Sequence, residues 1–203
     1  MKLDREFYLR EDTIKVARDL IGKLVVVPDE EGRRVSGMIV ETEAYLGVAD
    51  RAAHTYGGRR TARNEVVYGT GGHAYVFFIY GMYYQLNCVI GPPDHPHVVL
   101  IRAVEPVEGV EKMRERRGPM NDRNLTSGPG KLCIAFGIDR GLNGADLRGE
   151  LIWVETHREI TESEIESGVR IGIDYAGEDA AKPWRFWLRG NPFVSKMPGK
   201  RKG

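Results

Sequence analysis

The chain has 203 residues, and its 30 Lys and Arg against 29 Asp and Glu give a formal net charge of +1. This balance excludes a protein that binds polyanions through bulk positive charge, and 41% hydrophobic residues exclude a wholly disordered chain. The length predicts one domain over residues 1–203, with a basic, mobile end at about 196–203. The apolar runs are too short to cross a bilayer, so we expect no membrane contact.

Apolar periodicity and turn residues predict the elements in chain order. Asp12 caps the first predicted helix, Pro106 opens the second, and Ser127 caps the third. The predicted helices are 13–20, 107–117 and 131–136; the predicted strands are 23–27, 35–45, 74–80, 84–90, 98–104, 151–155, 169–173 and 184–188; and a long ordered loop covers 46–72. Because the strands cluster without regular βαβ alternation, we predict one α+β domain built on an antiparallel sheet.

Charge is unevenly distributed along this neutral chain. The runs 51–63 and 182–202 contain basic residues and no acid, whereas 159–179 is acidic apart from Arg170. A solvated face is the ordinary explanation of a single charge run. Two acid-free basic runs, both rich in glycine and aromatic residues, favour a surface that contacts phosphates.

The predicted hairpin has an unusual tip, which reads Tyr80-Gly81-Met82-Tyr83-Tyr84. Hairpin tips are normally polar, with Asn-Gly or Asp-Gly turns. One interpretation is that these large side chains pack under another element of the core. The other is a wedge that enters a nucleic-acid groove and replaces an extruded base. The sequence pattern alone leaves both open.

Two carboxylates and a phenol, Glu41, Glu43 and Tyr45, share one face of the strand 35–45 because side chains alternate along a strand. That face is either exposed to solvent or turned into a cleft. A buried carboxylate needs a partner, and Arg102, within an otherwise apolar strand, is the best candidate. A paired glutamate in a cleft would stay ionised, as a general base for water requires.

The other polar motifs are weaker. His54 stands in a loop beside arginines, where a lone histidine is more often structural than catalytic. Residues 128–131 (GPGK) lack the full phosphate-loop pattern and indicate at most a helix N-terminus that binds one phosphate. Residues 69–72 do not precede a helix, so they are no dinucleotide fingerprint. The five histidines and two cysteines lack metal-ligand spacing, so we expect no metal site.

Several motifs follow one another in a definite order. They are VETEAYLG at 40–47, AAH at 52–54, GGR at 57–59 with RN at 63–64, YGMY at 80–83, LIRA at 100–103 with EP at 105–106, SGP at 127–129 with KLC at 131–133, and RG at 189–190 with Pro192. In residues, order and spacing, from about 3 to 194, the chain resembles the alkyladenine (3-methylpurine) DNA glycosylases. The resemblance implies a single compact α+β domain with a curved antiparallel β-sheet, flanking helices and a protruding β-hairpin.

The resemblance also implies how the reaction is catalysed. Glu43 would be the general base that orients and deprotonates the attacking water. Arg102 and the main-chain carbonyl at Ile171 would help to hold that water. No lysine stands at the matching site to attack the sugar, so the enzyme is expected to leave an abasic site without cutting the strand.

A second group of residues would bind the base, again by resemblance. Tyr45 and His54 would sandwich the flipped base, with Phe77 completing the stack and the main chain at His54 recognising the base edge. Asn87 and Leu100 would line the pocket and reject the exocyclic amino group of normal guanine.

A third group would contact DNA. Tyr80 would intercalate where the nucleotide left, with Met82 and Tyr83 beside it. The implied contacts with the DNA backbone are Arg59, Arg63 and Lys131. A known family member has Tyr in place of Phe77 and His in place of Tyr175, which bears on substrate preference more than on reaction type.

The expected function is therefore a repair glycosylase that hydrolyses the N-glycosidic bond of alkylated or deaminated purines in double-stranded DNA, as a monomer without metal or organic cofactor. A charged N-terminus without a signal peptide and two isolated cysteines predict the cytoplasm and nucleoid of a prokaryote, or a nucleus. The alternatives are a noncatalytic nucleic-acid binding protein and a small-molecule hydrolase that uses Glu43 and His54. The sequence does not rank 3-methyladenine, 7-methylguanine, hypoxanthine and ethenoadenine as substrates.

Overall fold

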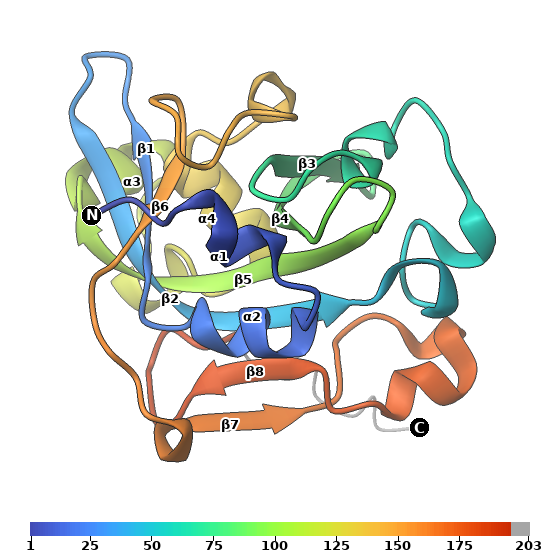
Figure 1. The fold of residues 1–203 in the computed structure, drawn as a ribbon. Helices are drawn as coiled ribbons and strands as arrows, with labels where there is room; N and C mark the ends of the chain where they lie inside the picture. Colours follow the sequence, from blue (N-terminus) through green and yellow to red (C-terminus); the bar gives the residue numbers. More distant parts are fainter. Residues whose placement is uncertain (196–203) are drawn as a thin grey trace.

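In the computed structural model, which describes residues 1–195, a single curled antiparallel sheet is flanked by short helices (Figure 1). The strands are β1 (Leu24–Pro28), β2 (Arg34–Tyr45), β3 (Ala74–Ile79), β4 (Tyr83–Ile90), β5 (His97–Glu108), β6 (Trp153–Glu155), β7 (Ile165–Gly168) and β8 (Arg185–Leu188). The α-helices are α1 (Arg5–Leu9), α2 (Thr13–Asp19), α3 (Val110–Arg117) and α4 (Pro129–Phe136). The predicted α+β class and antiparallel sheet are confirmed. The expected mobile end, 196–203, lies outside the described residues.

Strand β2 is the centre of the sheet. The main path runs β3-β4-β5-β2-β1-β6, while β8 pairs with β2 and β7 pairs with β8. The first half of β2 therefore lies between β5 and β1, and residues 41–43 lie between β5 and β8. Register shifts on both sides of Glu41 bend the strand there. With neighbours on both edges and both faces covered, residues 35–44 are all buried.

The helices cover the sheet and complete the core. Helix α2 packs on β2, and α4 packs on β4 and β5 (Figure 1). The predicted cap of α2 is confirmed, because the Asp12 side chain accepts a hydrogen bond of 2.9 Å from the Lys15 amide. Helix α1 has only five residues, too few for a periodic apolar pattern, and was not predicted.

The predicted start of the second helix is wrong, and for the third the predicted Pro129 in the first turn is confirmed but the predicted cap is wrong. Strand β5 continues through Pro106, and α3 begins after Gly109, whose φ is 70°. Pro106 is tolerated in a strand because it pairs with Gly37 next to a register shift, where the ladder is interrupted. Helix α4 starts after Gly128, whose φ of 152° a residue with a side chain rarely adopts. Ser127 therefore does not cap the helix.

The predicted strand at 169–173 is also wrong. Its place beside β8 is taken by β7, four residues earlier, whose Ser167 pairs with Phe186. Residues 169–173 instead form a turn that leads into a 3-10 segment, Asp174–Ala181. This turn brings the Ile171 amide to 2.7 Å from Oε1 of Glu43 on β2. Within residues 1–195, no helix is long and apolar enough to span a membrane.

Candidate active site

Glu41 and Glu43 lie in the buried middle of β2, and both side chains are fully inaccessible to solvent. Arg102 on β5 contacts both: its Nε lies 3.0 Å from Oε1 of Glu41, and its Nη1 lies 3.2 Å from Oε1 of Glu43. The predicted Glu–Arg pair is confirmed, and the solvent-exposed alternative is wrong. Burial acts to lower the pKa of Arg102, but the charges of Glu43 and Glu41 outweigh it and raise the pKa.

Glu43 receives its other two contacts from residues that line a pocket. The Ile171 amide donates to Oε1 at 2.7 Å, and the Tyr45 hydroxyl donates to Oε2 at 2.8 Å. Burial, together with the charge of Glu43, raises the pKa of Tyr45 well above its ordinary value, so its hydroxyl keeps its proton. Among residues 1–195, Oε1 of Glu43 thus has two partners, Arg102 and Ile171, whereas Oε2 has one, Tyr45.

Glu41 is bound differently. Arg185 Nη1 lies 3.1 Å from Oε1, and Ser195 donates its amide to Oε2 at 2.7 Å and its hydroxyl to Oε1 at 2.8 Å. With Arg102, these donors tie Glu41 to β5, β8 and the segment after β8. Its two oxygens are occupied by groups that hold the fold together.

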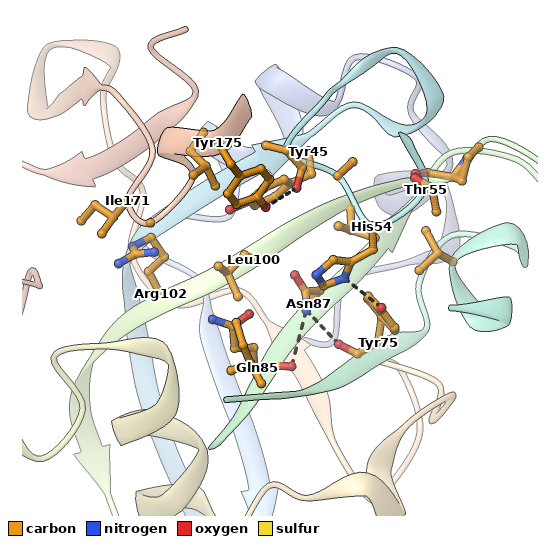
Figure 2. A pocket seen from close by; sticks show the side chains of 18 of the residues that line it. Tyr45, His54, Thr55, Tyr75, Gln85, Asn87, Leu100, Arg102, Ile171 and Tyr175 are labelled. Atoms are coloured by element: carbon orange, nitrogen blue, oxygen red, sulfur yellow. Dashed lines mark hydrogen bonds between the residues drawn. The ribbon is translucent and has the colours of Figure 1, made fainter. Parts of the chain in front are cut away.

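The pocket opens between the loop after β2, the hairpin β3–β4 and the turn before Asp174 (Figure 2). Its lining residues include Tyr45, Ala52, Ala53, His54, Thr55, Tyr75, Ile79, Tyr80, Gln85, Asn87, Leu100, Arg102, Ile171, Gly172 and Tyr175. Three of them, Tyr45, Arg102 and Ile171, are the donors to Glu43. The carboxylate thus lies directly behind one wall of the pocket.

His54 is held in that pocket by two aromatic residues. Its Nδ1 lies 3.0 Å from the Tyr75 hydroxyl, and its ring centroid lies 4.0 Å from that of Phe77. Burial, helped by the charges of Arg63 and Arg59, lowers the pKa of His54 to about 4. The imidazole is therefore neutral at physiological pH.

The expected positions of the base-binding residues are only partly observed. Tyr45, His54, Asn87 and Leu100 line the pocket, but Phe77 does not; it stacks on His54 from behind. Phe77 therefore stacks on His54 without lining the pocket itself, and its expected role in completing the stack on a bound base stays a prediction. Asn87 and Leu100 are opposite each other across β4 and β5, and the Asn87 amide donates to the Tyr75 carbonyl at 3.0 Å. Ile171 contacts Glu43 through its amide, whereas a role of its carbonyl was expected.

Tyr75 is a pocket residue that sequence reasoning missed. Its ring lines the pocket beside His54 and contacts both His54 and Phe77. Strand alternation was the available signal, because Tyr75 and Phe77 stand two residues apart on the same strand.

The hairpin tip is exposed. Exposed fractions are 76% for Tyr80, 63% for Met82 and 41% for Tyr83, so packing under the core is wrong for these side chains. Tyr80 also lines the pocket mouth and has a φ of 55°, in the left-handed region. Tyr83 lies against Gly130 at the start of α4, where an added Cβ would approach the ring to 3.1 Å.

The predicted basic residues flank this hairpin. Arg59 is exposed, and Arg63 donates to the Phe78 carbonyl at 3.2 Å and lies 4.8 Å from the Phe77 ring centroid. On the other side, Lys131 contacts the Ser127 hydroxyl at 3.3 Å. Lys131, Arg123 and Arg102 line a second hollow whose described lining contains no carboxylate.

The described part of the basic run 182–202 is paired with carboxylates, and its contact with phosphates stays a prediction. Arg185 is buried against Glu41, Lys182 pairs with Asp179 at 2.6 Å, and Arg189 pairs with Glu166 at 3.2 Å. Asp179 and Glu166, both in the acidic segment 159–179, thus neutralise Lys182 and Arg189, although the basic run contains no acid of its own. Residues 196–202 lie outside the described residues. Among residues 1–195, no three His, Cys, Asp or Glu side chains are arranged to hold a metal ion.

Comparison with known proteins adds an independent finding. Residues 6–192 match the model of the Methylpurine-DNA glycosylase (MPG) family. A Clostridium acetobutylicum protein is 52% identical, over 97% of this chain and 98% of its own. A Desulfitobacterium hafniense protein is 48% identical over 96% and 98%, and a Bacillus cereus protein 47% identical over 97% and 100%. All three carry the name "Putative 3-methyladenine DNA glycosylase".

Proposed function

Because the chain belongs to the methylpurine-DNA glycosylase family and is a hydrolase of N-glycosyl bonds, we propose that it flips alkylated or deaminated purines out of duplex DNA and hydrolyses their glycosidic bonds with a water activated by Glu43. The observation that carries this proposal is the buried Glu43 carboxylate, bound by three donors directly behind an aromatic pocket. An exposed aromatic tip stands at the mouth of that pocket.

The pocket suits a flat, positively charged base. Alkylation at purine N3 or N7 makes the base cationic and a good leaving group. The faces of Tyr45 and His54 can hold such a base, and cation–π attraction favours it over a neutral base by about 0.5–2 kcal/mol. A neutral His54 matters here, because a protonated imidazole would repel the cation. Asn87 and Leu100 line the pocket and would leave no room for the exocyclic amino group of normal guanine.

Glu43 suits the activation of water. Its Oε2 accepts one described hydrogen bond, from Tyr45, and so retains capacity to accept a proton from a water in the pocket. The same negative charge would stabilise the oxocarbenium-like sugar as the base leaves. Arg102 and Ile171 hold the other oxygen and fix the carboxylate.

The hairpin suits extrusion of the nucleotide. Tyr80 would fill the space left in the duplex, with Met82 and Tyr83 beside it in the groove, and Arg59, Arg63 and Lys131 would contact phosphates. The exposure of Tyr80 disfavours a small-molecule hydrolase, which needs no exposed aromatic tip. No lysine is among the described residues that line the pocket, which supports hydrolysis without strand cleavage.

The test is base release from DNA treated with dimethyl sulfate, followed by alkali to cut abasic sites. We expect Glu43→Gln to lower the rate by about 10²- to 10⁴-fold, since it removes the general base, while binding to damaged duplex persists. Glu105→Gln, on the same strand as Arg102 but bonded to Asn191, is the matched control and should keep its activity.

Three results would count against the proposal. Near-normal release by Glu43→Gln would remove Glu43 as the base. Binding without any release by the unaltered protein would indicate a noncatalytic binding protein. Strand cuts before alkali would contradict simple hydrolysis.

A further inference from the structure

Arg170 and Asp50 form a buried ion pair beside the pocket. Arg170 Nη1 lies 2.6 Å from Oδ2 of Asp50, and Nη2 lies 2.9 Å from Oδ1, so the pairing is bidentate. Both side chains have 0% exposure, and neither lines the pocket. A buried pair of this kind is by itself weak evidence for stability, because apolar residues often replace it without loss. Its other contacts therefore decide what it does.

On one side, the Asp50 carboxylate of the pair connects residues on both sides of it in the loop that follows β2. The Asp50 carboxylate accepts hydrogen bonds from the Leu46 amide at 3.1 Å and the Ala52 amide at 3.0 Å. These bonds fix the loop between Tyr45 and the pocket residues Ala52 and His54. Loss of the carboxylate would release the chain on both sides of these residues.

On the other side, the pair fixes a strand end and a ring. Arg170 donates to the Ala44 carbonyl at 2.9 Å and the Asp179 carbonyl at 3.3 Å. Its guanidinium lies 4.7 Å from the Tyr45 ring centroid and 5.0 Å from that of Trp184. Tyr45 lines the pocket and Arg170 does not, so Arg170 supports the ring from outside.

These contacts converge on Glu43. Among residues 1–195, its hydrogen-bond donors are the Tyr45 hydroxyl and the Ile171 amide, and its ion-pair partner is Arg102. Arg170 contacts the ring of Tyr45 and immediately precedes Ile171 in the chain. We propose that Arg170, clamped by Asp50, is a positioning residue that holds these two hydrogen-bond donors of Glu43 in place for hydrolysis. This inference rests on the function proposed above.

The test separates positioning from folding. Arg170→Lys keeps the charge but loses the bidentate fork and the flat stacking surface. The double variant Arg170→Met with Asp50→Asn removes both charges, so no unpaired charge stays buried. Arg5→Lys is the matched control, because Arg5 also bonds an aspartate, Asp146 at 2.7 Å, and a backbone carbonyl, Gly71 at 2.6 Å, away from the pocket.

Each variant is compared for single-turnover base release from methylated DNA, for Kd with damaged duplex and for thermal unfolding, with rates measured below the unfolding transition. We expect both Arg170 variants to lose about tenfold or more in single-turnover rate, with Kd within about twofold, because a small misplacement of a reacting group costs this much. Arg5→Lys should match the unaltered protein in rate.

A folded Arg170 variant with an unchanged rate would overturn the inference, and so would a loss of folding in both variants, which would assign the pair to the fold alone. These failures differ from failure of the proposed function. In that case the unaltered protein would itself release no base.

Discussion

Glu41 and Glu43 stand two residues apart on β2, both fully buried and both bound to Arg102, yet their surroundings differ. The remaining donors to Glu41 are Arg185 and Ser195, which belong to β8 and the segment after it. The remaining donors to Glu43 are Tyr45 and Ile171, which line the pocket. One carboxylate therefore connects elements of the fold, and the other connects residues that a bound base would touch.

The difference teaches that burial and pairing do not identify a catalytic carboxylate. In each glutamate, Oε2 accepts one described hydrogen bond, from the Ser195 amide in Glu41 and from the Tyr45 hydroxyl in Glu43, so the number of bonds does not separate them. The useful criterion is where the donors lie. By that criterion Glu43, whose donors line the pocket, is the candidate base, and Glu41 is the residue that holds Arg102 in place.

The most direct test of the difference between Glu41 and Glu43 is to neutralise each carboxylate in turn. Glu41→Gln should lower the free energy of unfolding by about 3–5 kcal/mol, because it removes a buried negative charge that contacts both Arg102 and Arg185. Glu43→Gln should lower it less, because Arg102 keeps Glu41. Urea unfolding of both variants measures this. Equal losses would show that the two sites do not differ in their structural role.

A second prediction concerns Tyr80 at the hairpin tip, where stability and DNA binding are expected to change in opposite directions. Tyr80 has a φ of 55°, and the left-handed region costs a residue with a side chain about 1–2 kcal/mol, less for asparagine. Tyr80→Asn should therefore raise the free energy of unfolding, by up to about 1 kcal/mol, while it weakens binding to damaged duplex. Met82→Asn at the same exposed tip is the control, because Met82 has no positive φ and should gain nothing. Unchanged binding by Tyr80→Asn would argue against a wedge.

A third prediction concerns pH. Burial first, and then Arg63 and Arg59, lower the folded-state pKa of His54 to about 4, whereas an unfolded histidine titrates near 6.5. Between about pH 6.5 and 4, His54 is protonated in the unfolded chain and neutral in the folded chain. The free energy of unfolding therefore falls as the pH falls through this window. His54→Gln should make the plot of unfolding free energy against pH less steep there, by the amount that corresponds to about one bound proton. An unchanged slope would mean that His54 titrates normally.

Much of the local structure could be predicted because its causes are local. The Asp12 cap, the β3–β4 hairpin and the shared face of Glu41, Glu43 and Tyr45 each follow from residues a few positions apart. The choice of Arg102 as partner followed from the cost of an unpaired charge in an apolar strand. The family resemblance added the expected roles, which spacing alone did not supply.

Errors occurred where distant segments meet. Pro106 is part of β5 because a register shift beside its partner Gly37 interrupts the hydrogen-bond ladder there, so no amide donor is needed at this position. Residues 169–173 form a turn because β7 already pairs with the edge of β8. Tyr75 was missed although strand alternation pointed to it. Each of the first two outcomes depends on a partner far away in the sequence.

The sequence alone was sufficient for the α+β class, the shared face of Glu41, Glu43 and Tyr45 and the choice of Arg102 as partner if that face is buried, since alternation and the cost of burying charge act at short range. Which carboxylate adjoins the pocket depended on tertiary structure, because Ile171, Arg185 and Ser195 lie more than 120 positions from the glutamates that they contact. The pairing of Lys182, Arg185 and Arg189 with Asp179, Glu41 and Glu166 likewise depended on it. Ion pairs and hydrogen bonds depend on distance in space, which the chain sets only once it has folded.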